Sequence, residues 1–475
     1  MSNQLLYSLK WSALGEIASK VLPPLFYIIT ARLLTPEDFG VVATSAMVVA
    51  FASILWEAGL SKALIQNQEH DNLQKMSNIV LYTNMALSIF LYIILFFTSD
   101  VIASFFHDER VTRVLQISGL SLLIGSFMSV QTALLQKDFD FKKLFLSRFI
   151  GAIIPGIVSV ALAYYGYGYW ALVYGTIVSM ILQALILWNV SPWRPSYEFD
   201  YEIAKKMFHF SKWVLLSALL SWFFVWGDIF VLGFFFSSHE LGLYRTGNYL
   251  AGSIVGIVTA PIVPVMYSYF SKIQHDKENL KKALLISSKV ISFFVLPICV
   301  GLYIVQNPLS DLIFGEKWLG IASVVGYLSL MHGVAWIIGL NNSAYIAIGR
   351  PDIESKILIT NLFLYLIVYI LSAQINFEFF LFSRFMLAAV SIFVHLYVSK
   401  KFFNLGVLEK FGNIKYILFI LISIIIVNNV FLYKFIYNNL SMFLVLLASL
   451  IIYLIIIYFF DKKFLITLIN IFKYK

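Results

Sequence analysis

One acidic residue lies inside a long apolar stretch of this 475-residue chain. Asp228 occurs in the segment Val225-Trp226-Gly227-Asp228-Ile229-Phe230, with no other charged residue within a helical turn. A lone carboxylate in such surroundings is expected to be protonated or paired with another helix. Two interpretations are open: Asp228 is a coupling site for H⁺ or Na⁺, or it makes a hydrogen bond that holds the two halves of the protein together.

Other ionisable residues also fall within apolar stretches, nearer to their ends. Glu16 and Lys20 are four residues apart and share one helix face, in the favourable Glu-then-Lys order. They either face a substrate cavity or form a neutralised pair whose lysine reaches the membrane interface. Further cations are candidates for phosphate contact or, equally, for the interface. The candidate cavity residues are Glu16, Lys20, Arg148, Asp228, Lys289 and Arg384.

The sequence offers little for metal chemistry. His332 and His395 are expected to be satisfied by neighbouring helices, because a metal site would need more ligands. Cys299 is the only cysteine, so a disulfide within the chain and a cysteine metal site are both impossible. No cofactor is expected beyond a coupling H⁺ or Na⁺.

The elements that position these residues are predicted to be membrane-spanning helices. Hydrophobic residues make up 60% of the chain and charged residues 12%, and the mean hydropathy is +0.86. A spanning helix needs about 20 mostly apolar residues, and about fourteen such stretches occur. Their approximate extents are 11–33, 40–58, 78–97, 114–136, 144–164, 169–189, 213–235, 246–270, 285–306, 319–346, 357–373, 377–398, 414–432 and 441–460. The predicted fold class is an all-α integral membrane protein.

Basic residues alternate between the loops. The net charge of +9 forms no single patch of the kind that nucleic acid would bind. About 24 Lys and Arg residues fall on one side of the predicted membrane and about 6 on the other, which predicts that both chain ends are cytoplasmic. No cleavable signal peptide is expected, because the first apolar stretch is too long for one. The loops on the other side are short, which argues against an enzyme.

A corner of the chain occurs twice, 202 residues apart. Lys10-Trp11 precedes the first apolar stretch, and Leu33-Leu34-Thr35-Pro36-Glu37-Asp38-Phe39-Gly40 follows it; Lys212-Trp213 and Phe235-Phe236-Ser237-Ser238-His239-Glu240-Leu241-Gly242 repeat the pattern. Each corner is typical of a capped helix start. An even offset in spans predicts a parallel repeat, with the substrate path between the halves. The predicted parts are a six-helix half at 1–200, a six-helix half at 201–405 and two additional helices at 406–475.

Prolines interrupt several of the apolar stretches, where each removes a backbone donor and can kink a helix. Pro23-Pro24 in the first stretch is a candidate hinge for rocking between the halves. A static packing kink is the alternative.

Several ordered motifs resemble one family. The chain resembles the Wzx-type polysaccharide flippases of the multidrug/oligosaccharidyl-lipid/polysaccharide exporter superfamily, which includes O-antigen, colanic acid and teichuronic acid flippases. The matching segments are Ala31–Gly40, Gly166–Gly175, Trp193–Pro195, Glu240–Tyr244 and Pro264–Gln274. Beyond about residue 400 the spans are generic.

The resemblance implies two six-helix bundles around a central cavity and alternating access. The implied substrate is an undecaprenyl-pyrophosphate-linked oligosaccharide, moved to the outer leaflet of the bacterial cytoplasmic membrane for surface polysaccharide biosynthesis. In that case Lys20 would meet the pyrophosphate and Glu16 would modulate it. Membrane lipids and polysaccharide polymerase or assembly proteins are the further partners implied.

Two related functions stay open: a cation-coupled multidrug exporter and a peptidoglycan lipid-precursor flippase. A carrier of drug cations needs a mainly acidic cavity, whereas a pyrophosphate carrier needs basic residues. The candidates include four cations and two acids, which favours the anionic lipid. A membrane enzyme is disfavoured, since neither a large external loop nor an acidic metal site is visible.

Overall fold

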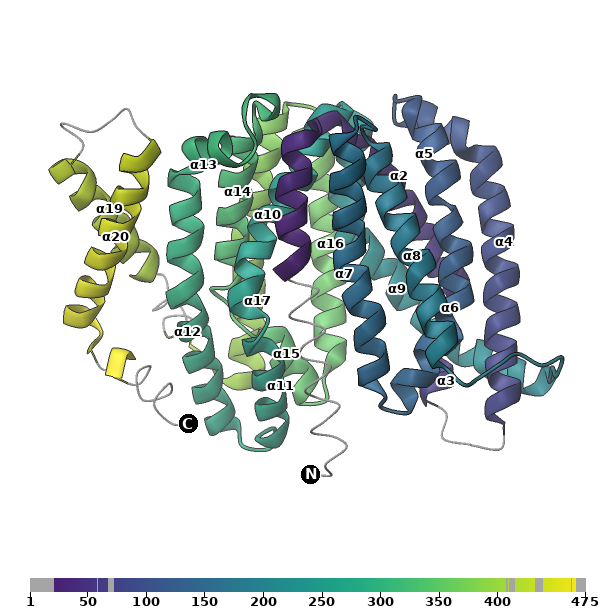
Figure 1. Ribbon diagram of the computed structural model, residues 1–475. Helices are drawn as coiled ribbons and strands as arrows, with labels where there is room; N and C mark the ends of the chain where they lie inside the picture. The colour runs from purple at the N-terminus through teal and green to yellow at the C-terminus, as the bar shows by residue number, and fades with distance from the viewer. Residues whose placement is uncertain are drawn as a thin grey trace. The chain divides into compact units, whose positions relative to one another are not determined.

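The computed structural model describes residues 21–57, 59–66, 72–406, 409, 415–431, 439–462 and 464–466. Within these ranges every regular element is a helix (Figure 1). Nine of the helices described there are long and apolar enough to cross a membrane. The prediction of an all-helical membrane protein is confirmed, whereas the total of fourteen spans and the repeat arrangement stay predictions.

The chain divides into two compact units, Met1–Arg245 and Thr246–Lys475. The first contains a helical segment at Val21–Leu33, followed by eight complete helices and the first residues of α10. These helices are α2 (Pro36–Glu57), α3 (Leu60–Gln66), α4 (Leu73–Phe105), α5 (Arg110–Ser118), α6 (Leu120–Lys137), α7 (Phe141–Tyr164), α8 (Trp170–Val190) and α9 (Tyr201–Phe235). The predicted boundary between the two halves, at residues 200/201, describes the repeat. The division into compact units does not test this boundary.

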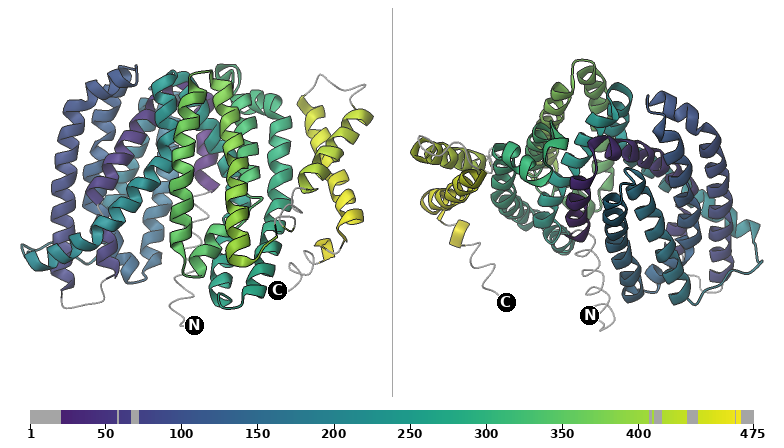
Figure 2. Two further views of the ribbon diagram at one scale, coloured as in Figure 1. Left: turned by 180° about the vertical axis from the view of Figure 1, so that it is seen from behind. Right: turned by 45° about the horizontal axis from the view of Figure 1, so that its top comes forward.

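The helices of the first unit pack against one another, and the turns that connect them lie at the two ends of the unit. α2 packs against α5 and α9, and α4 against α5 and α6. The indole of Trp222 on α9 donates a hydrogen bond of 3.3 Å to the Met47 carbonyl of α2. Figures 1 and 2 show the α4–α5, α7–α8 and α9–α10 turns at one end of this unit, and the α6–α7 turn at the other. The α6–α7 turn, which is rich in lysine (Lys137, Lys142 and Lys143), thus lies at the opposite end of the unit from the repeated corner at 235–242.

The second unit contains the rest of α10 (Ser238–Thr259) and the helices that follow it. These are α11 (Ile262–Lys272), α12 (Lys277–Ile304), α13 (Gln306–Ile313), the 3₁₀ helix η1 (Glu316–Trp318), α14 (Ile321–Ala335), α15 (Asn341–Ala347), α16 (Pro351–Ala373), α17 (Phe377–Phe403), α19 (Lys415–Phe431) and α20 (Asn439–Phe460). α14 packs against both α12 and α17. α19 packs against α12 and pairs with α20.

Besides the stretch 114–136, which divides into α5 and α6 at Gly119, two predicted stretches are each broken into two helices, which corrects their extents. The stretch 246–270 divides into α10 and α11 around Pro261, because proline has no N–H to continue the helical hydrogen bonds. The stretch 319–346 divides into α14 and α15, with Gly339 at φ +68° between them. A glycine tolerates this left-handed conformation without strain.

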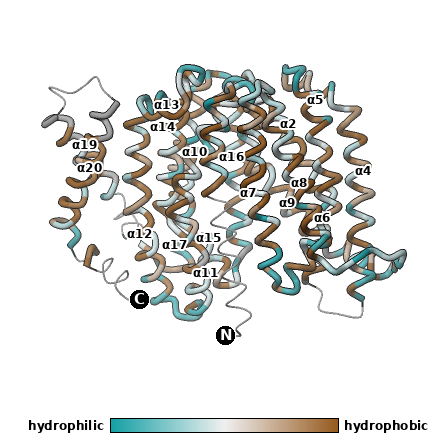
Figure 3. Tube along the Cα trace, in the orientation of Figure 1, coloured by the Kyte–Doolittle hydropathy of each residue, from teal (hydrophilic) through white to brown (hydrophobic). Residues whose placement is uncertain are grey.

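Apolar side chains cover the helices away from their ends. Figure 3 shows hydrophobic residues along the helix lengths and hydrophilic residues at many of the turns. Many large apolar residues are exposed, among them Phe97 on α4, Phe363 on α16 and Phe393 on α17. Such surfaces are suited to lipid, because water would penalise them. The chain is therefore a multi-pass membrane protein.

Candidate functional site

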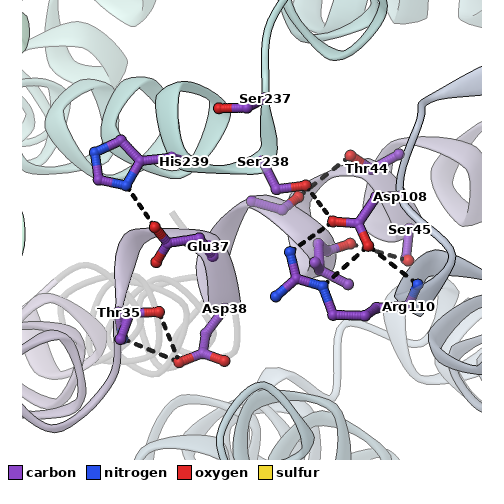
Figure 4. A network of polar contacts seen from close by, with 12 residues as sticks. Thr35, Glu37, Asp38, Thr44, Ser45, Asp108, Arg110, Ser237, Ser238 and His239 are labelled. Atoms are coloured by element: carbon purple, nitrogen blue, oxygen red, sulfur yellow. Dashed lines mark hydrogen bonds and ion pairs between the residues drawn. The ribbon is translucent and has the colours of Figure 1, made fainter.

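The first corner starts α2 as the sequence predicts. The Thr35 backbone N–H donates to the Asp38 carboxylate at 3.0 Å, and the Thr35 hydroxyl donates to the same oxygen at 3.2 Å. Pro36 begins the helix, where its missing N–H costs nothing. Figure 4 shows this reach-back by Asp38. The corner is thus fixed by its own residues.

The second corner repeats this arrangement at the start of α10. The Ser237 backbone N–H donates to the Glu240 carboxylate at 3.0 Å, and the Ser237 hydroxyl bonds to the same oxygen. The helix begins at Ser238. Both predicted capping patterns are confirmed.

The two corners contact each other reciprocally. A Cβ built on Gly40 would lie 1.8 Å from the Ser238 carbonyl oxygen, and one built on Gly242 would lie 1.7 Å from the Pro36 carbonyl oxygen. Pro36 and Ser238 are equivalent in the two corners, as are Gly40 and Gly242. Each glycine therefore packs on the first helical residue of the other corner, a pattern that two-fold symmetry produces. We call this contact the α2–α10 crossing.

Glu37 and His239 also occupy equivalent positions, and they bond to each other. The distance from His239 Nδ1 to Glu37 Oε1 is 2.6 Å, and Figure 4 shows the two side chains facing across the crossing. A local axis that relates the corners must pass between these two residues. Because the equivalents differ in type, they form an acid–imidazole pair instead of placing two like groups together.

Asp108, in the turn between α4 and α5, ties α10 to a further element. Its carboxylate accepts hydrogen bonds from the Arg110 guanidinium at 2.7 and 2.9 Å and from the Ser238 hydroxyl at 2.5 Å. Burial raises the pKa of Asp108, but the hydrogen bonds from Arg110 and Ser238 outweigh it and hold the pKa below its usual value. The local sequence predicts that 107–110 is a solvated loop. The signal that could have indicated the Asp108–Arg110 contact is an acid two residues before an arginine at a helix start.

Asp228 lies on α9 and is buried. The Tyr244 hydroxyl of α10, which is also buried, donates a hydrogen bond of 2.5 Å to its carboxylate. Both residues belong to the first unit and to the predicted second half. This hydrogen bond therefore joins two helices of one half, whereas the sequence suggested one across the halves. The coupling role stays a prediction.

Lys289 contacts a carboxylate near the end of the described chain. Its Nζ lies 2.9 Å from Asp461, and Lys415 Nζ lies 2.6 Å from the same oxygen. The Tyr416 hydroxyl donates to that oxygen at 3.0 Å. Burial raises the pKa of Asp461, but hydrogen bonds from Lys415 and Lys289 outweigh it and lower the pKa. Lys289 thus links α12 to the segment after α20; the predicted phosphate contact is untested.

The remaining candidates are not brought into one cluster. Arg384 on α17 bonds to the Tyr369 hydroxyl of α16 and lies 5.2 Å from the centre of its ring. Arg148 is half-buried on α7. Pro23 and Pro24 belong to the helical segment Val21–Leu33, and their hinge role is untested. Glu16 and Lys20 lie outside the described residues.

The predicted pairing of the intramembrane histidines can be followed for His332. Its Nε2 lies 3.1 Å from Asn248 Oδ1, which links α14 to α10 within the second unit. His395 on α17 is stacked with the Tyr345 ring at 6.2 Å between centroids. The hydrogen bond of His332 agrees with the expectation, and His395 has a ring contact with Tyr345.

Comparisons with known proteins identify the family. The family model described as "Polysaccharide biosynthesis protein" matches residues 29–323. The succinoglycan biosynthesis transport protein ExoT of Rhizobium meliloti is 26% identical over 324 residues, covering 68% of this chain and 65% of ExoT. The teichuronic acid biosynthesis protein TuaB of Bacillus subtilis is 24% identical over 363 residues, covering 74% of this chain and 73% of TuaB. The chain thus spans slightly less than two thirds of ExoT.

A solved structure shows the same fold. The lipid II flippase MurJ in an inward closed conformation matches with a TM-score of 0.78 and 15% identity, covering 96% of this chain and 100% of that chain. At this identity the likeness concerns the fold alone. The family match covers more than half of the chain, and the chain therefore belongs to the polysaccharide biosynthesis protein family.

Proposed function

We propose that this protein moves an undecaprenyl-pyrophosphate-linked oligosaccharide repeat unit across the bacterial cytoplasmic membrane by alternating access. The product would be used in surface polysaccharide biosynthesis. Family membership supports a transport role, as do relatives named as biosynthesis transport proteins. The protein would act without catalysing a reaction, in contact with membrane lipids and with polymerase or assembly proteins, and with both chain ends in the cytoplasm.

The observation that supports alternating access most directly is the α2–α10 crossing. Two equivalent corners close on each other through glycine–backbone contacts and one acid–imidazole pair. Contacts of this kind separate without breaking either helix, because each corner is capped by its own acid. The reciprocity supports a parallel repeat, with halves at 1–200 and 201–405 and two additional helices at 406–475.

Buried charge supports coupling of transport to a cation. Asp228 and Tyr244 form a buried carboxylate–hydroxyl pair. Burying an ionised carboxylate is costly, so binding of H⁺ or Na⁺ at Asp228 would alter the balance between states.

The proposed cavity cations would contact the pyrophosphate; they are Lys20, Arg148, Lys289 and Arg384. Glu16 would lie beside Lys20, and Pro23-Pro24 would act as a hinge.

A leaflet-accessibility assay tests this function. In cells that lack the gene and any redundant flippase, the radiolabelled repeat unit should stay inaccessible to a glycosidase added outside, and plasmid-borne protein should restore access. Normal access in the deletion strain would overturn the proposal. Parallel assays with peptidoglycan precursor and with cationic dyes would detect the two related functions, since each predicts movement of its own substrate instead.

A further inference from the structure

A pocket of about 830 Å³ lies beside the α2–α10 crossing in the first unit. The α4–α5 turn forms one wall with His107, Asp108, Glu109 and Arg110; the α9–α10 turn forms another, and Glu37 of α2 completes the lining. Its volume falls in the range of about 300–1,000 Å³ that is usual for small-molecule sites. No candidate residue from the sequence lines this pocket.

The lining combines hydrogen-bonding groups with aromatic rings. Phe106 and Phe234–Phe236 contribute the rings, and the His107 ring packs against Phe234 at 6.3 Å between centroids. Carboxylates, imidazoles, a guanidinium and serine hydroxyls supply donors and acceptors within the same pocket. Sugars present hydroxyl groups together with apolar C–H faces, so this mixture fits a saccharide.

The charge of the pocket distinguishes the sugar from the pyrophosphate. Glu37, Asp108 and Glu109 are carboxylates, and Arg110 is already engaged by Asp108. Carboxylates repel phosphate oxygens at close range. The pocket therefore suits the uncharged, hydroxyl-bearing part of a ligand.

The backbone at His107 holds this arrangement. Its φ is +56°, a left-handed conformation that is strained for a non-glycine residue. The conformation directs the chain from α4 into α5 and places His107 and Glu109 in the lining. Both residues are exposed, so a ligand can reach them.

Some pocket residues also make the polar contacts of the crossing. Glu37 bonds to His239, and Asp108 bonds to Ser238; all four residues line the pocket. Figure 4 shows these contacts close together. Ligand hydroxyl groups that bond to these side chains would replace contacts between α2, the α4–α5 turn and α10.

We propose that this pocket binds the oligosaccharide part of the substrate, and that binding there loosens the α2–α10 crossing. The proposal rests on the proposed function for the identity of the sugar. It adds a saccharide subsite on the side of the protein opposite the lysine-rich α6–α7 turn, built from the α4–α5 and α9–α10 turns. It also links occupancy of that subsite to separation of the two corners.

Calorimetry on the full chain in lipid nanodiscs tests binding. The probe is the carrier-free oligosaccharide released by mild acid from the producing strain's own surface polysaccharide. We expect saturable binding that weakens about tenfold in Glu109→Gln and in His107→Asn, as for the loss of a hydrogen bond to a charged group. Asn is chosen because it tolerates the left-handed backbone. The control Glu202→Gln replaces an exposed acid at the start of α9 and should bind as the wild type does.

Hydrogen–deuterium exchange with the same probe tests the link to the crossing. Amides at 37–40 and 238–242 should exchange faster when the sugar is bound. Binding without faster exchange would overturn the link, and absence of binding, or equal binding by all variants, would overturn the subsite. If the protein restores access in the leaflet assay but no binding is measured, the subsite alone is refuted. If the deletion strain shows normal access, the proposed function is refuted.

Discussion

Glu37 and His239 are equivalent residues of two similar corners, and their side chains bond to each other at 2.6 Å. A pair that lies on a local two-fold axis would bring identical groups together if the two halves had identical sequences. Two glutamates would repel each other. Two histidines would provide no carboxylate to accept the hydrogen bond. The difference in residue type at this one position therefore makes the crossing self-complementary.

Exchange of these two residues should preserve function. We expect His239→Glu and Glu37→His to lower surface polysaccharide, and the double exchange to restore it, because the local symmetry lets either corner supply either partner. Both side chains are more than one third exposed, so the coupling free energy should be about 0.5–1 kcal/mol. Immunoblots of membranes provide the control for protein amount. Additive losses in the double variant would contradict the symmetric arrangement.

A methyl group at either crossing glycine should destabilise the protein. Gly40→Ala and Gly242→Ala place a Cβ within 2 Å of a backbone oxygen, which the neighbouring helix must move to accommodate. Overpacking of this kind costs about 1–3 kcal/mol. Thermal unfolding in detergent should show the loss for both.

Gly256→Ala is the matched control for that experiment. Gly256 lies on α10, as Gly242 does, but a Cβ there meets no atom within 4 Å. Alanine should stabilise the helix by up to about 1 kcal/mol. Equal melting temperatures for the Gly40, Gly242 and Gly256 variants would show that the corners do not pack as described.

Asp108 should make stability depend on pH in the acid range. Its pKa is held below the usual value in the folded state, so its contribution is complete above the unfolded pKa of about 3.9. The contribution is lost as the pH falls through the folded pKa. Asp108→Asn should therefore unfold at a lower temperature than the wild type at pH 7, and the difference should shrink below pH 4. A gap that widened on acidification would contradict the assigned contacts.

Local structure at the corners was predictable from sequence, but their contact was not. Thr35, Asp38, Ser237 and Glu240 lie within three residues of their partners, so sequence spacing alone indicates the caps. Repetition at an offset of 202 residues establishes which residues are equivalent. It does not establish that equivalent residues meet, because that depends on how the helices cross.

Contacts between residues that are far apart in the sequence also depend on how the helices pack, so local patterns do not predict them. Asp108 bonds to Ser238, which is 130 residues away, and the local pattern gave only an exposed loop. No local pattern indicates the pairing of Asp461 with Lys289, because 172 residues separate them. Around Pro261 the hydrophobic pattern continues through the break between α10 and α11, so hydropathy alone predicts one span where the proline separates two helices.

The Asp461 cluster should hold the last described helices to α12. Asp461→Asn leaves Lys289 and Lys415 facing each other without a carboxylate, which should cost about 1.5–3 kcal/mol. We expect faster trypsin cleavage between α17 and α19 in membranes. Asp311→Asn changes an exposed aspartate of α13 and should leave the cleavage rate unchanged; equal rates for both variants would show that the cluster does not secure this region.

Replacement of the buried carboxylate tests cation coupling. Asp228→Asn should abolish most translocation in the leaflet assay while membrane protein levels stay normal, because the amide keeps the shape and an acceptor for Tyr244 but takes up no H⁺ and offers Na⁺ no negative charge. Tyr244→Phe removes the hydroxyl donor and keeps the carboxylate, so it should retain translocation. If Asp228→Asn translocates normally, Asp228 is not the coupling site. If both variants lose protein from the membrane, the pair serves to pack α9 against α10.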